Sequence, residues 1–586
     1  MGSPCAGRCA LATESTTEAS VIARLARNTS PCRARYDDQG MHPSVQERLA
    51  RLAADQRAAA TAPPGPLLCI APAGSGKTTT LVARAAWLIA TGTPADGIRA
   101  ITFNKRAAVE MTERLDTALA PLGVAPGAVK VRTFHALGRE ILRDAGIPVE
   151  PLADRPALLR EVAPWADDAT LLRLDTMVSK LKVELGVSPA AVAADPEAGP
   201  FARAYVAYEA AVAASGGLDF DDLILRAIER LDADPGLLAG WRARCRELLV
   251  DEVQDVDRAQ LRLALLLAAP ANHIFLVGDD DQSIYGWRLA DVRRILGIAD
   301  HLPGLRRVDL EVNYRCPRPV VERAVRLVER NIERFPKRIR AAPRATGALV
   351  LAPDAADETL RLERAVRRWP EDGSTRAVLA RTNRELLPAV VVALELGVPF
   401  RAPRIDLILE DPRLDAILDH AVLGSAPAEP AVVATGRERR AIIEDPSSTP
   451  ADTEIAVALL AWAAGSASLE ALRVALESVR TRLLELRRDD AALTLATAHA
   501  TKGLEFDHVV VIGMEAGRFP SGRTVAEAED PVRAYEEERR LAYVAWTRAR
   551  RTLTLLYDPA VPSPFLLEAF SPDELGLSSE PDGVPG

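Results

Sequence analysis

The stretch Ala71-Pro72-Ala73-Gly74-Ser75-Gly76-Lys77-Thr78 has the composition of a phosphate-binding loop. An apolar run over residues 66–70 precedes it, and a helical pattern over residues 81–88 follows it. A strand, a loop of small residues and a helix, in this order, are the context in which such a loop binds phosphate. Small residues let backbone N–H groups surround an anion, and the helix N-terminus adds partial positive charge. The sequence therefore predicts a nucleotide site here.

Two side chains of the loop have chemistry of their own. Lys77 can place a compact cation on the β- and γ-phosphates, and the Thr78 hydroxyl can bind Mg²⁺. Only seven of the 73 basic residues are lysines, which makes a lysine here informative; the alternative is a glycine-rich turn with a chance lysine. The residues expected to bind the nucleotide at this loop are Ala71, Pro72, Ala73, Gly74, Ser75, Gly76, Lys77, Thr78 and Thr79.

The composition indicates a globular protein of several domains. The chain of 586 residues is too long for one core, and its 48% hydrophobic and 26% charged residues argue against disorder. No apolar run reaches the roughly 18–20 residues of a membrane span, and no signal-peptide core is present, so we expect a cytoplasmic protein without a membrane partner. The six cysteines lack metal-ligand spacing, which indicates reduced thiols. The net charge of −9 excludes a generally basic coat for nucleic acid but not a local groove.

Strand and helix patterns alternate along most of the chain. Buried strands are predicted at 98–103, 129–134, 247–252 and 273–279, and a second set at 377–380, 508–512 and 553–557. This alternation predicts parallel sheets with helices on both faces. Residues 140–215 are helical without a strand pattern, as expected of an inserted helical domain.

Two adjacent carboxylates, Asp251 and Glu252, end the predicted strand 247–252. Asp251 can hold Mg²⁺ directly or through water, and Glu252 can accept a proton from an attacking water. Ligands bind at the carboxyl edge of parallel sheets, which favours this interpretation over a solvated acidic run.

Several further segments resemble, in family order, the motifs of the UvrD/Rep/PcrA family of superfamily 1 DNA helicases. Residues 278–288, GDDDQSIYGWR, are similar to the third motif of that family nearly letter for letter. The other similar segments are 102–111, 133–135, 313–315, 499–506 and 537–549. The matches run from about residue 52 to residue 568, so the resemblance covers most of the chain.

The resemblance implies roles around the nucleotide. Gln56 would read adenine, Tyr314 would stack on it, and Glu505 would meet the ribose. Gln282 would contact the γ-phosphate and couple its presence to the DNA-binding groove.

Arg315 and Arg548 would reach the γ-phosphate from the second α/β region. Charge accumulates on the phosphoryl oxygens in the transition state, where an inserted arginine increases the rate by ~10³–10⁵. A surface salt bridge is the alternative for each arginine. The residues expected to act in hydrolysis are Lys77, Asp251, Glu252, Gln282, Arg315 and Arg548.

Aromatic residues in loops at strand ends are candidates for stacking on bases, in a chain with only 4% aromatic residues. Each stacked base gains ~1–3 kcal/mol whatever its sequence. Core packing is the alternative, and it is stronger for Phe103 and Phe134 than for Tyr285 and Trp287, which have polar neighbours. The residues expected to contact DNA are Phe103, Thr133, Phe134, His135, Tyr285, Trp287, Arg288 and His499.

The resemblance implies an α/β fold class, with two RecA-like parallel-sheet P-loop domains in one chain and helical insertion domains. Residues 1–43 are expected to be a disordered tail or a mis-assigned start, with Met41 as the biological start. The expected domains are the first RecA-like ATP-binding domain at 44–139 and 218–305, a helical insertion at 140–217, the second RecA-like domain at 306–404 and 487–570, a reduced helical insertion at 405–486, and an acidic tail at 571–586.

The expected activity is that of an ATP-dependent helicase or translocase on single-stranded DNA, with ATP and Mg²⁺ as cofactors. By resemblance it would move 3′→5′ and serve DNA repair or replication-related processing. Expected partners are single-stranded DNA, DNA junctions and a repair or nuclease protein, and the chain is expected to be a monomer. A DNA-gated ATPase switch and the motor subunit of a separate nuclease remain alternatives. An RNA substrate stays open, since stacking tolerates either sugar.

Residues 405–486 depart from the family pattern. The corresponding domain of family members touches duplex DNA, but here it has about half the expected length and no Gly-Ile-Gly-type hairpin. Its fourteen acidic residues against seven arginines would repel DNA. We therefore expect translocation to exceed strand separation. Trp546, within the last motif, is a second departure, and the sequence gives no physical account of it beyond packing.

Overall fold

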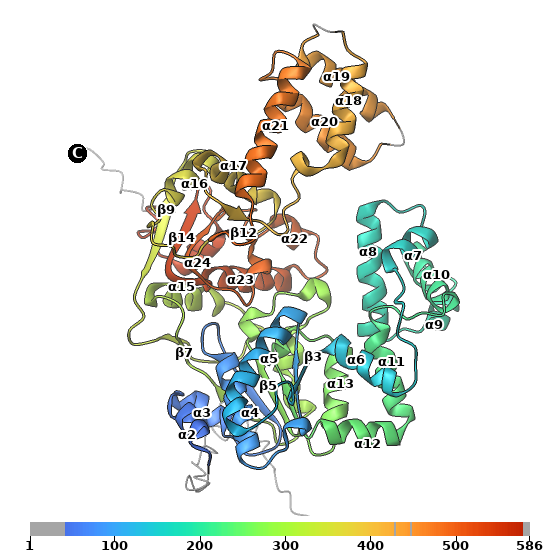
Figure 1. Ribbon diagram of the computed structural model, residues 1–586, viewed down its shortest axis with the longest axis vertical. Coiled ribbons are helices and arrows are strands. Elements are labelled where there is room, and N and C mark those ends of the chain that lie inside the picture. The colour runs from blue at the N-terminus through green and yellow to red at the C-terminus, as the bar shows by residue number, and fades with distance from the viewer. Residues whose placement is uncertain (1–40, 427–428, 446–447, 578–586) are drawn as a thin grey trace, which may run out of the picture.

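The computed structural model describes residues 41–426, 429–445 and 448–577. Figure 1 shows two α/β bodies, one above the other, with a group of helices projecting from each. We call the body that contains Lys77 the first lobe and the body that contains Arg548 the second lobe. The expectations for residues 1–40 and for 578–586 lie outside the described residues. Three of the six cysteines, Cys5, Cys9 and Cys32, belong to residues 1–40.

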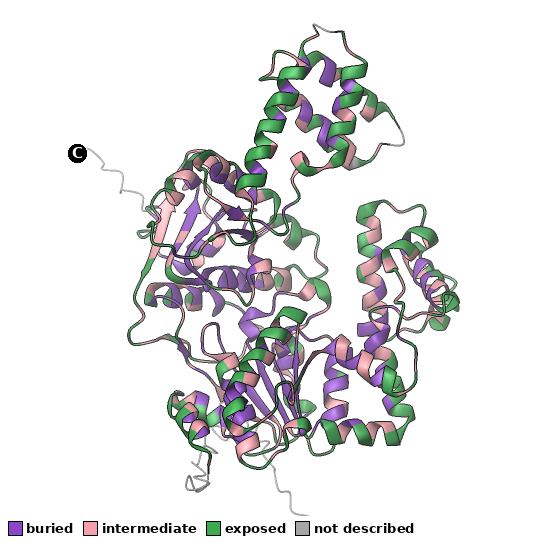
Figure 2. Ribbon diagram, in the orientation of Figure 1, coloured by how far each residue is buried: buried purple, intermediate pink, exposed green. Residues whose placement is uncertain are grey.

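The first lobe is built on a parallel sheet with the strand order β3-β2-β4-β5-β1-β6. The strands are β1 (Leu67–Ile70), β2 (Ile98–Thr102), β3 (Lys130–Thr133), β4 (Glu247–Val250), β5 (Ile274–Gly278) and β6 (Arg306–Asp309). Every residue of β1, β2, β4 and β5 is buried, and Figure 2 shows these strands in purple. Such continuous burial is typical of parallel sheets covered on both faces.

Nine α-helices of the described residues belong to the first lobe or lie directly against its sheet. They are α2 (Pro43–Ala50), α3 (Ala54–Ala60), α4 (Lys77–Ala90), α5 (Lys105–Leu119), α6 (Phe134–Asp144), α11 (Asp222–Ala233), α12 (Pro235–Arg244), α13 (Arg258–Ala268) and α14 (Val292–Leu296). The strand predicted at 129–134 ends one residue early because Phe134 starts α6, which Thr133 caps through its hydroxyl.

Strand β6 extends the first sheet past residue 305, where the first domain was expected to end. It pairs in parallel with β1, with Arg306 opposite Leu67 and Asp309 opposite Ile70. Its sequence is mostly charged and only partly buried because it is the edge strand of the sheet. A hydrophobic pattern therefore gave no signal for it.

The second lobe contains a second parallel sheet, with the order β11-β12-β10-β13-β14-β9. Its strands are β9 (Ala348–Pro353), β10 (Arg376–Ala380), β11 (Phe400–Arg401), β12 (Leu493–Thr497), β13 (Phe506–Val511) and β14 (Ala549–Tyr557), and a separate short pair consists of β7 (Val312–Asn313) and β8 (Arg340–Ala341). The helices are α15 (Arg318–Val328), α16 (Glu358–Val366), α17 (Leu387–Leu396), α22 (Gly522–Ala526), α23 (Pro531–Trp546) and α24 (Pro564–Ala569). The expected α/β class with parallel sheets is confirmed.

Trp546 ends α23 inside the core of the second lobe. Its side chain is fully buried, and its ring centroid lies 6.2 Å from that of Phe570. The structure thus places this side chain in the packed core.

The first insertion is a helical group that is anchored to the first lobe by buried charge. It comprises α7 (Arg155–Val162), α8 (Asp168–Ser179), a π-helical turn (Lys180–Leu185), α9 (Pro189–Ala193) and α10 (Pro200–Ala214). The Lys182 ammonium lies 2.8 Å from Glu209, 2.9 Å from Asp219 and 3.1 Å from Asp222. Because Glu209 belongs to α10 and Asp222 begins α11, this lysine joins the insertion to the lobe.

The second insertion has a small core of its own. It comprises α18 (Pro412–Leu423), α19 (Ala431–Glu444), α20 (Pro450–Ala463) and α21 (Leu469–Leu486). Leu414, Leu418, Leu459 and Leu472 are buried among these helices. Figure 1 shows the group projecting away from both sheets, with α21 leading back to the second lobe. Within the described ranges, no helix combines the length and apolar content needed to cross a bilayer.

Candidate active site and nucleic-acid interface

The predicted phosphate-binding loop joins β1 to α4. Gly74 and Gly76 have φ angles of +69° and +82°, in the left-handed region that favours glycine. Helix α4 begins at Lys77, and its N-cap Gly76 has no side chain to bond the first-turn N–H groups. These groups are thus available to an anion. Ala71, Pro72, Ala73 and Ser75 are buried, Thr78 is half-buried, and Thr79 is exposed.

Gln56 lies directly against this loop. Its Nε2 donates a 2.8 Å hydrogen bond to the Ser75 carbonyl. A Cβ on Gly76 would come within 2.5 Å of the same nitrogen, so the side chain packs tightly on the turn. The structure therefore brings Gln56 to the nucleotide loop, as its expected role requires.

Lys77 and the acidic pair meet at the carboxyl edge of the first sheet. Lys77 Nζ lies 2.7 Å from Glu252 Oε2. Burial by itself would raise the pKa of Glu252, but the charges of Lys77 and Lys502 hold it below its usual value. Burial and the Glu252 charge raise the pKa of Asp251 to about 7. Glu252 also has a φ of +53°, a strained conformation of the kind found at functional sites.

Gln254 and Asp279 connect this pair to Gln282. Gln254 Nε2 donates to Glu252 Oε2 at 2.6 Å, and Gln254 Oε1 accepts from the Asp279 backbone N–H at 3.0 Å. Asp279 Oδ2 accepts from Gln282 Nε2 at 2.6 Å. The amide expected to contact the γ-phosphate is thus held by hydrogen bonds within the same sheet edge.

Residues 313–315 of the second lobe pack on the loop of the first. The Tyr314 N–H donates to the Gly74 carbonyl at 2.9 Å, and a Cβ on Gly74 would lie 2.7 Å from Arg315 Cβ. The Tyr314 side chain is 51% exposed. Arg315 Nε donates to Glu505 Oε2 at 2.7 Å. The structure thus gathers Tyr314, Arg315 and Glu505 beside the phosphate-binding loop.

Arg548 is a buried cation without a carboxylate partner. Its residue is 1% exposed, and no ion pair to it occurs in the part of the chain that the structure describes. Its guanidinium donates to the carbonyls of Val544 and Leu504 at 2.8 and 3.1 Å, and approaches Gln282 Oε1 at 3.5 Å. Burial lowers the pKa of Arg548 to about 9. Such a desolvated cation is stabilised when an anion binds next to it.

Lys502 is a functional candidate that the sequence did not single out. Its ammonium lies 2.5 Å from Asp255 Oδ2 and 2.5 Å from the Gln282 carbonyl, across the boundary between the lobes. The same nitrogen lies 5.1 Å from the centre of the Tyr285 ring. Its place in the motif at 499–506, in a chain poor in lysine, is the signal that could have identified it.

Three aromatic rings, of which Phe103 and Tyr285 are half-buried and Trp287 is exposed, gather next to the Gln282 segment. The rings of Phe103 and Tyr285 stack with centroids 5.1 Å apart, and Trp287 lies edge-on to Tyr285 at 6.2 Å. Trp287 is 61% exposed. The Arg288 guanidinium lies 5.4 Å from the Phe103 ring and 5.6 Å from the Trp287 ring. These four residues form one surface, which we call the aromatic track.

A second pair of stacked rings joins one residue of α6 to one residue of the segment before α11. His135 stacks on Phe220 with centroids 3.8 Å apart, and Phe220 is 50% exposed. Burial lowers the pKa of His135 to about 4, so the imidazole is neutral at pH 7. The sequence did not indicate Phe220; an exposed aromatic before the acidic start of α11 carries no local pattern.

Phe134 is not available to a base. It is 3% exposed and packs in the core with Leu137 and Ile141, because it lies on the inward side of α6. We therefore correct the expectation that Phe134 contacts DNA, since its ring belongs to the core.

The other two residues expected to contact DNA, Thr133 and His499, are half-buried. Thr133 caps α6 by accepting from the Ala136 N–H at 3.2 Å. The His499 carbonyl accepts from the Tyr285 hydroxyl at 3.5 Å, and burial lowers the pKa of His499 to about 3.

The donor set at the acidic pair suits Mg²⁺. Thr78 offers a hydroxyl and Asp251 a carboxylate, both hard oxygen donors. Mg²⁺ commonly binds one or two such groups together with substrate phosphates, without a cage of protein ligands. No cluster of three or more His, Cys, Asp or Glu side chains that could hold a metal occurs within the described ranges.

Family models match segments of both lobes. The model of the UvrD/REP helicase N-terminal domain matches residues 52–303, and that of the UvrD-like helicase C-terminal domain matches residues 466–559. The ATP-dependent DNA helicase UvrD2 of Mycobacterium bovis is 30% identical, over 86% of this chain and 78% of that protein. The chain belongs to the UvrD/Rep helicase family.

Other relatives of this UvrD/Rep helicase are similar over comparable lengths. DNA helicase II of Escherichia coli K12 is 29% identical, over 86% of this chain and 84% of that protein. The ATP-dependent DNA helicase Rep of the same organism is 28% identical, over 86% of this chain and 92% of that protein. Membership of the UvrD/Rep family confirms that the chain is an enzyme with RecA-like lobes.

Proposed function

We propose that this protein is an ATP-dependent DNA helicase that acts as a motor on single-stranded DNA. The observation that carries the proposal is Arg548, a buried cation from the second lobe that faces Gln282 of the first lobe. Among the described residues, no carboxylate pairs with it. A γ-phosphate bound between the two lobes would supply the missing anion. The names of the relatives, all helicases, support the same assignment.

Hydrolysis is assigned to the groups around the phosphate-binding loop. The first turn of α4 and Lys77 would hold the phosphates, and Mg²⁺ held by Thr78 and Asp251 would neutralise phosphate charge. Lys77 is paired with Glu252 in the structure. A phosphate that draws Lys77 away would leave the Glu252 carboxylate to accept the proton of the attacking water. Gln56 beside the loop, and Tyr314 and Glu505 from the second lobe, are assigned to the base and ribose.

The motor stroke follows from the origin of the two arginines. Arg315 and Arg548 belong to the second lobe, whereas the phosphate-binding loop belongs to the first. The γ-phosphate would hold the lobes together, and its loss would let them separate. One opening and closing of the cleft for each ATP is a cycle that can drive movement.

The aromatic track is the proposed path of the strand. Phe103, Tyr285 and Trp287 can stack on bases of any sequence, and Arg288 can bind phosphate. The His135–Phe220 pair offers a further ring face. Tyr285 of the track lies three residues after Gln282, so the γ-phosphate contact and part of the DNA contact lie on one short segment.

The direction 3′→5′ and a role in DNA repair or replication-related processing are proposed from the family resemblance. A DNA-gated ATPase switch and a motor subunit for a separate nuclease would use the same site. Measuring movement as well as hydrolysis distinguishes the switch from a motor.

The deciding experiment measures ATP hydrolysis without nucleic acid and with single-stranded DNA, single-stranded RNA or blunt duplex, alongside translocation toward a labelled DNA end. We expect strong stimulation by single-stranded DNA and arrival at the 5′ end. Equal stimulation by RNA would contradict the assignment to DNA. Stimulation without movement would favour the ATPase switch.

A further inference from the structure

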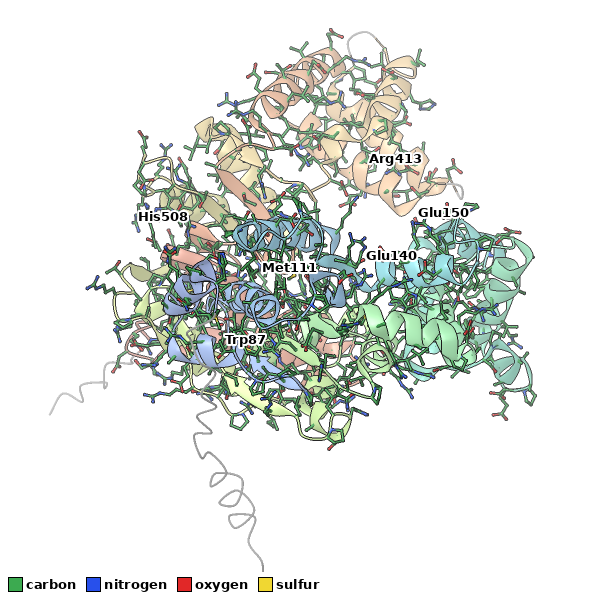
Figure 3. The ribbon with its side chains drawn as sticks, turned by 60° about the horizontal axis from the view of Figure 1, so that its bottom comes forward. Trp87, Met111, Glu140, Glu150, Arg413 and His508 are labelled. Atoms are coloured by element: carbon green, nitrogen blue, oxygen red, sulfur yellow. The ribbon has the colours of Figure 1, made fainter. Side chains whose placement is uncertain are left out.

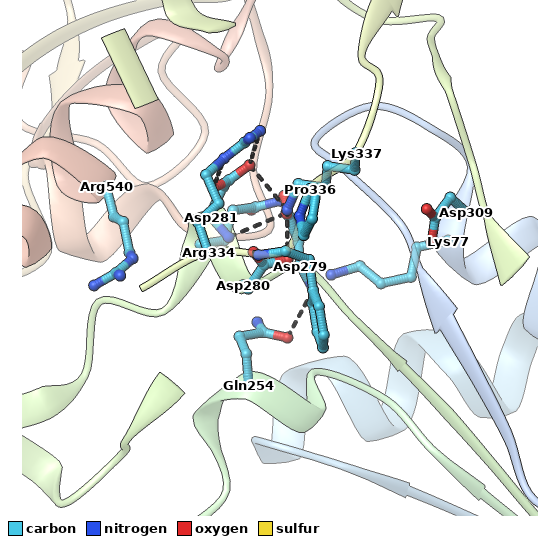
Figure 4. A network of polar contacts seen from close by, with 12 residues as sticks. Lys77, Gln254, Asp279, Asp280, Asp281, Asp309, Arg334, Pro336, Lys337 and Arg540 are labelled. Atoms are coloured by element: carbon cyan, nitrogen blue, oxygen red, sulfur yellow. Dashed lines mark hydrogen bonds and ion pairs between the residues drawn. The ribbon is translucent and has the colours of Figure 1, made fainter. Parts of the chain in front are cut away.

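Lys337 occupies a cage of three carboxylates at the boundary between the lobes. Its side chain is 1% exposed, and its ammonium lies 3.1 Å from Asp279 Oδ1, 2.9 Å from Asp281 Oδ2, and in direct contact with Asp280. The side chains of all three aspartates are at most 1% exposed. In Figure 4, Arg334 and Lys77 lie on opposite sides of this cluster, and the Lys77 side chain extends toward it. A cation buried this deeply is costly to desolvate, so the carboxylates around it hold it in place.

Lys337 belongs to a short segment that spans the two lobes. We call residues 331–337 the strap. At its beginning, the N–H groups of Ile332 and Glu333 donate to the Glu536 carboxylate of α23 at 2.6 and 3.2 Å. Arg540 of α23 donates to the Glu333 carbonyl at 2.8 Å. The start of the strap is therefore attached to α23.

The end of the strap is attached to the first lobe. Arg334 bonds both oxygens of Asp281, at 2.8 and 3.0 Å, and the Phe335 N–H donates to Asp280 at 2.8 Å. Arg307 of β6 donates to the Pro336 carbonyl at 2.8 Å. The strap thus joins α23 to the Asp279–Asp281 segment through only a few residues.

Asp279 connects Lys337 to the proposed ATPase site. Its Oδ1 faces Lys337, while its Oδ2 accepts the 2.6 Å hydrogen bond from Gln282 Nε2. Gln282 Oε1 in turn faces Arg548 at 3.5 Å. Lys337 and the Asp281 N–H, which donates to Asp279 Oδ1 at 3.2 Å, together hold one oxygen of this carboxylate, and this directs the other oxygen toward the Gln282 amide.

We propose that Lys337 is a positioning residue for ATP turnover: through Asp279 it holds Gln282 in the orientation that meets the γ-phosphate and Arg548. The inference rests on the proposed function, in which Gln282 contacts the γ-phosphate. Because the strap is attached to α23, a displacement of the second lobe reaches Gln282 by this route as well as through the nucleotide.

Lys337→Arg and Lys337→Met test the proposal, with Arg338→Met as the matched control, since Arg338 is the exposed neighbour. Arginine keeps the charge, but its planar fork cannot serve three carboxylates as a point charge does. We expect kcat with single-stranded DNA to fall at least tenfold in both variants, with KM for ATP changed less than threefold. The ratio of stimulated to basal hydrolysis should fall at least fivefold. Arg338→Met should match the wild type.

Thermal melting separates this role from a merely structural one. Loss of fold lowers basal and stimulated rates together and leaves their ratio unchanged, so Lys337→Arg with a wild-type melting temperature decides even if Lys337→Met does not fold. A folded Lys337→Arg variant with wild-type kcat and ratio would overturn the inference while leaving the proposed function intact. A wild-type enzyme without stimulation by single-stranded DNA would defeat the proposed function first.

Discussion

Gly286 in the first lobe donates a backbone hydrogen bond of 2.9 Å to the carboxylate of Glu537 on α23 of the second lobe. Gly286 lies between Tyr285 and Trp287 of the aromatic track, and α23 ends two residues before Arg548. Figure 3 gives a second view of the first lobe, with Trp87 and Met111 marking α4 and α5. The proposed DNA contact and the proposed γ-phosphate contact are therefore attached to the same helix.

Gly286→Ala should weaken this connection. A Cβ at position 286 would lie 2.2 Å from Glu537 Oε2, so the half-buried carboxylate must shift and its hydrogen bond to the Gly286 N–H is weakened. We expect stimulation of ATP hydrolysis by single-stranded DNA to fall severalfold, with basal hydrolysis nearly unchanged. Gly240→Ala in α12 is the control, because its added Cβ meets nothing within 4 Å apart from its chain neighbours and the backbone of its own helix. Wild-type stimulation in Gly286→Ala would show that the contact transmits nothing.

Glu252→Gln should abolish ATP hydrolysis but retain ATP binding, since only the proton acceptor is lost. Lys77→Ala should abolish hydrolysis too, and should also weaken binding of the phosphates. Turnover and binding of a fluorescent ATP analogue are the measurements, with the exposed Glu113→Gln as control. Hydrolysis near the wild-type rate in Glu252→Gln would mean that another group is the base.

Arg548→Ala should lower kcat by on the order of 10³, because charge on the phosphoryl oxygens is greatest in the transition state. Arg315→Ala should act in the same direction. Both variants should bind ATP with little change, which a comparison of kcat with ATP affinity measures. Arg523→Ala, in exposed α22, is the control. A variant that loses only affinity would identify its arginine as a clamp on bound ATP.

Trp287→Ala should weaken binding of single-stranded DNA by about one stacked base, ~1–3 kcal/mol. The ring is 61% exposed, so its removal should leave the melting temperature nearly unchanged. Trp165→Ala is the matched control, since Trp165 is 54% exposed on the first insertion. Unchanged DNA affinity together with a lower melting temperature would place Trp287 in packing instead.

The protein alone should translocate on single-stranded DNA better than it separates strands. The two lobes and the aromatic track suffice for movement, whereas the second insertion is short and acidic and projects from the second lobe. Single-turnover unwinding of a long duplex with a 3′ tail, beside a translocation assay, both with a protein trap, measures the difference. Processive unwinding by single monomers would mean that another surface grips the duplex.

Local pattern was sufficient for the parts of the protein that depend on neighbouring residues. The loop at 71–78, the carboxylates Asp251 and Glu252 and the buried strands before them were predicted because small residues, charge and apolar runs act within one turn or strand. The order of the motifs then indicated two α/β lobes, and the structure has two parallel sheets.

Contacts between distant segments needed the tertiary structure. Phe134 and Trp287 are both aromatics in predicted motifs, yet one faces the core and the other the solvent, which only packing decides. Lys337 lies 56 or more positions from its aspartates, and the edge strand β6 is too polar for a hydrophobic pattern to reveal. Burial and ion pairing at such positions arise when whole elements meet, and a linear pattern of residue types does not contain that geometry.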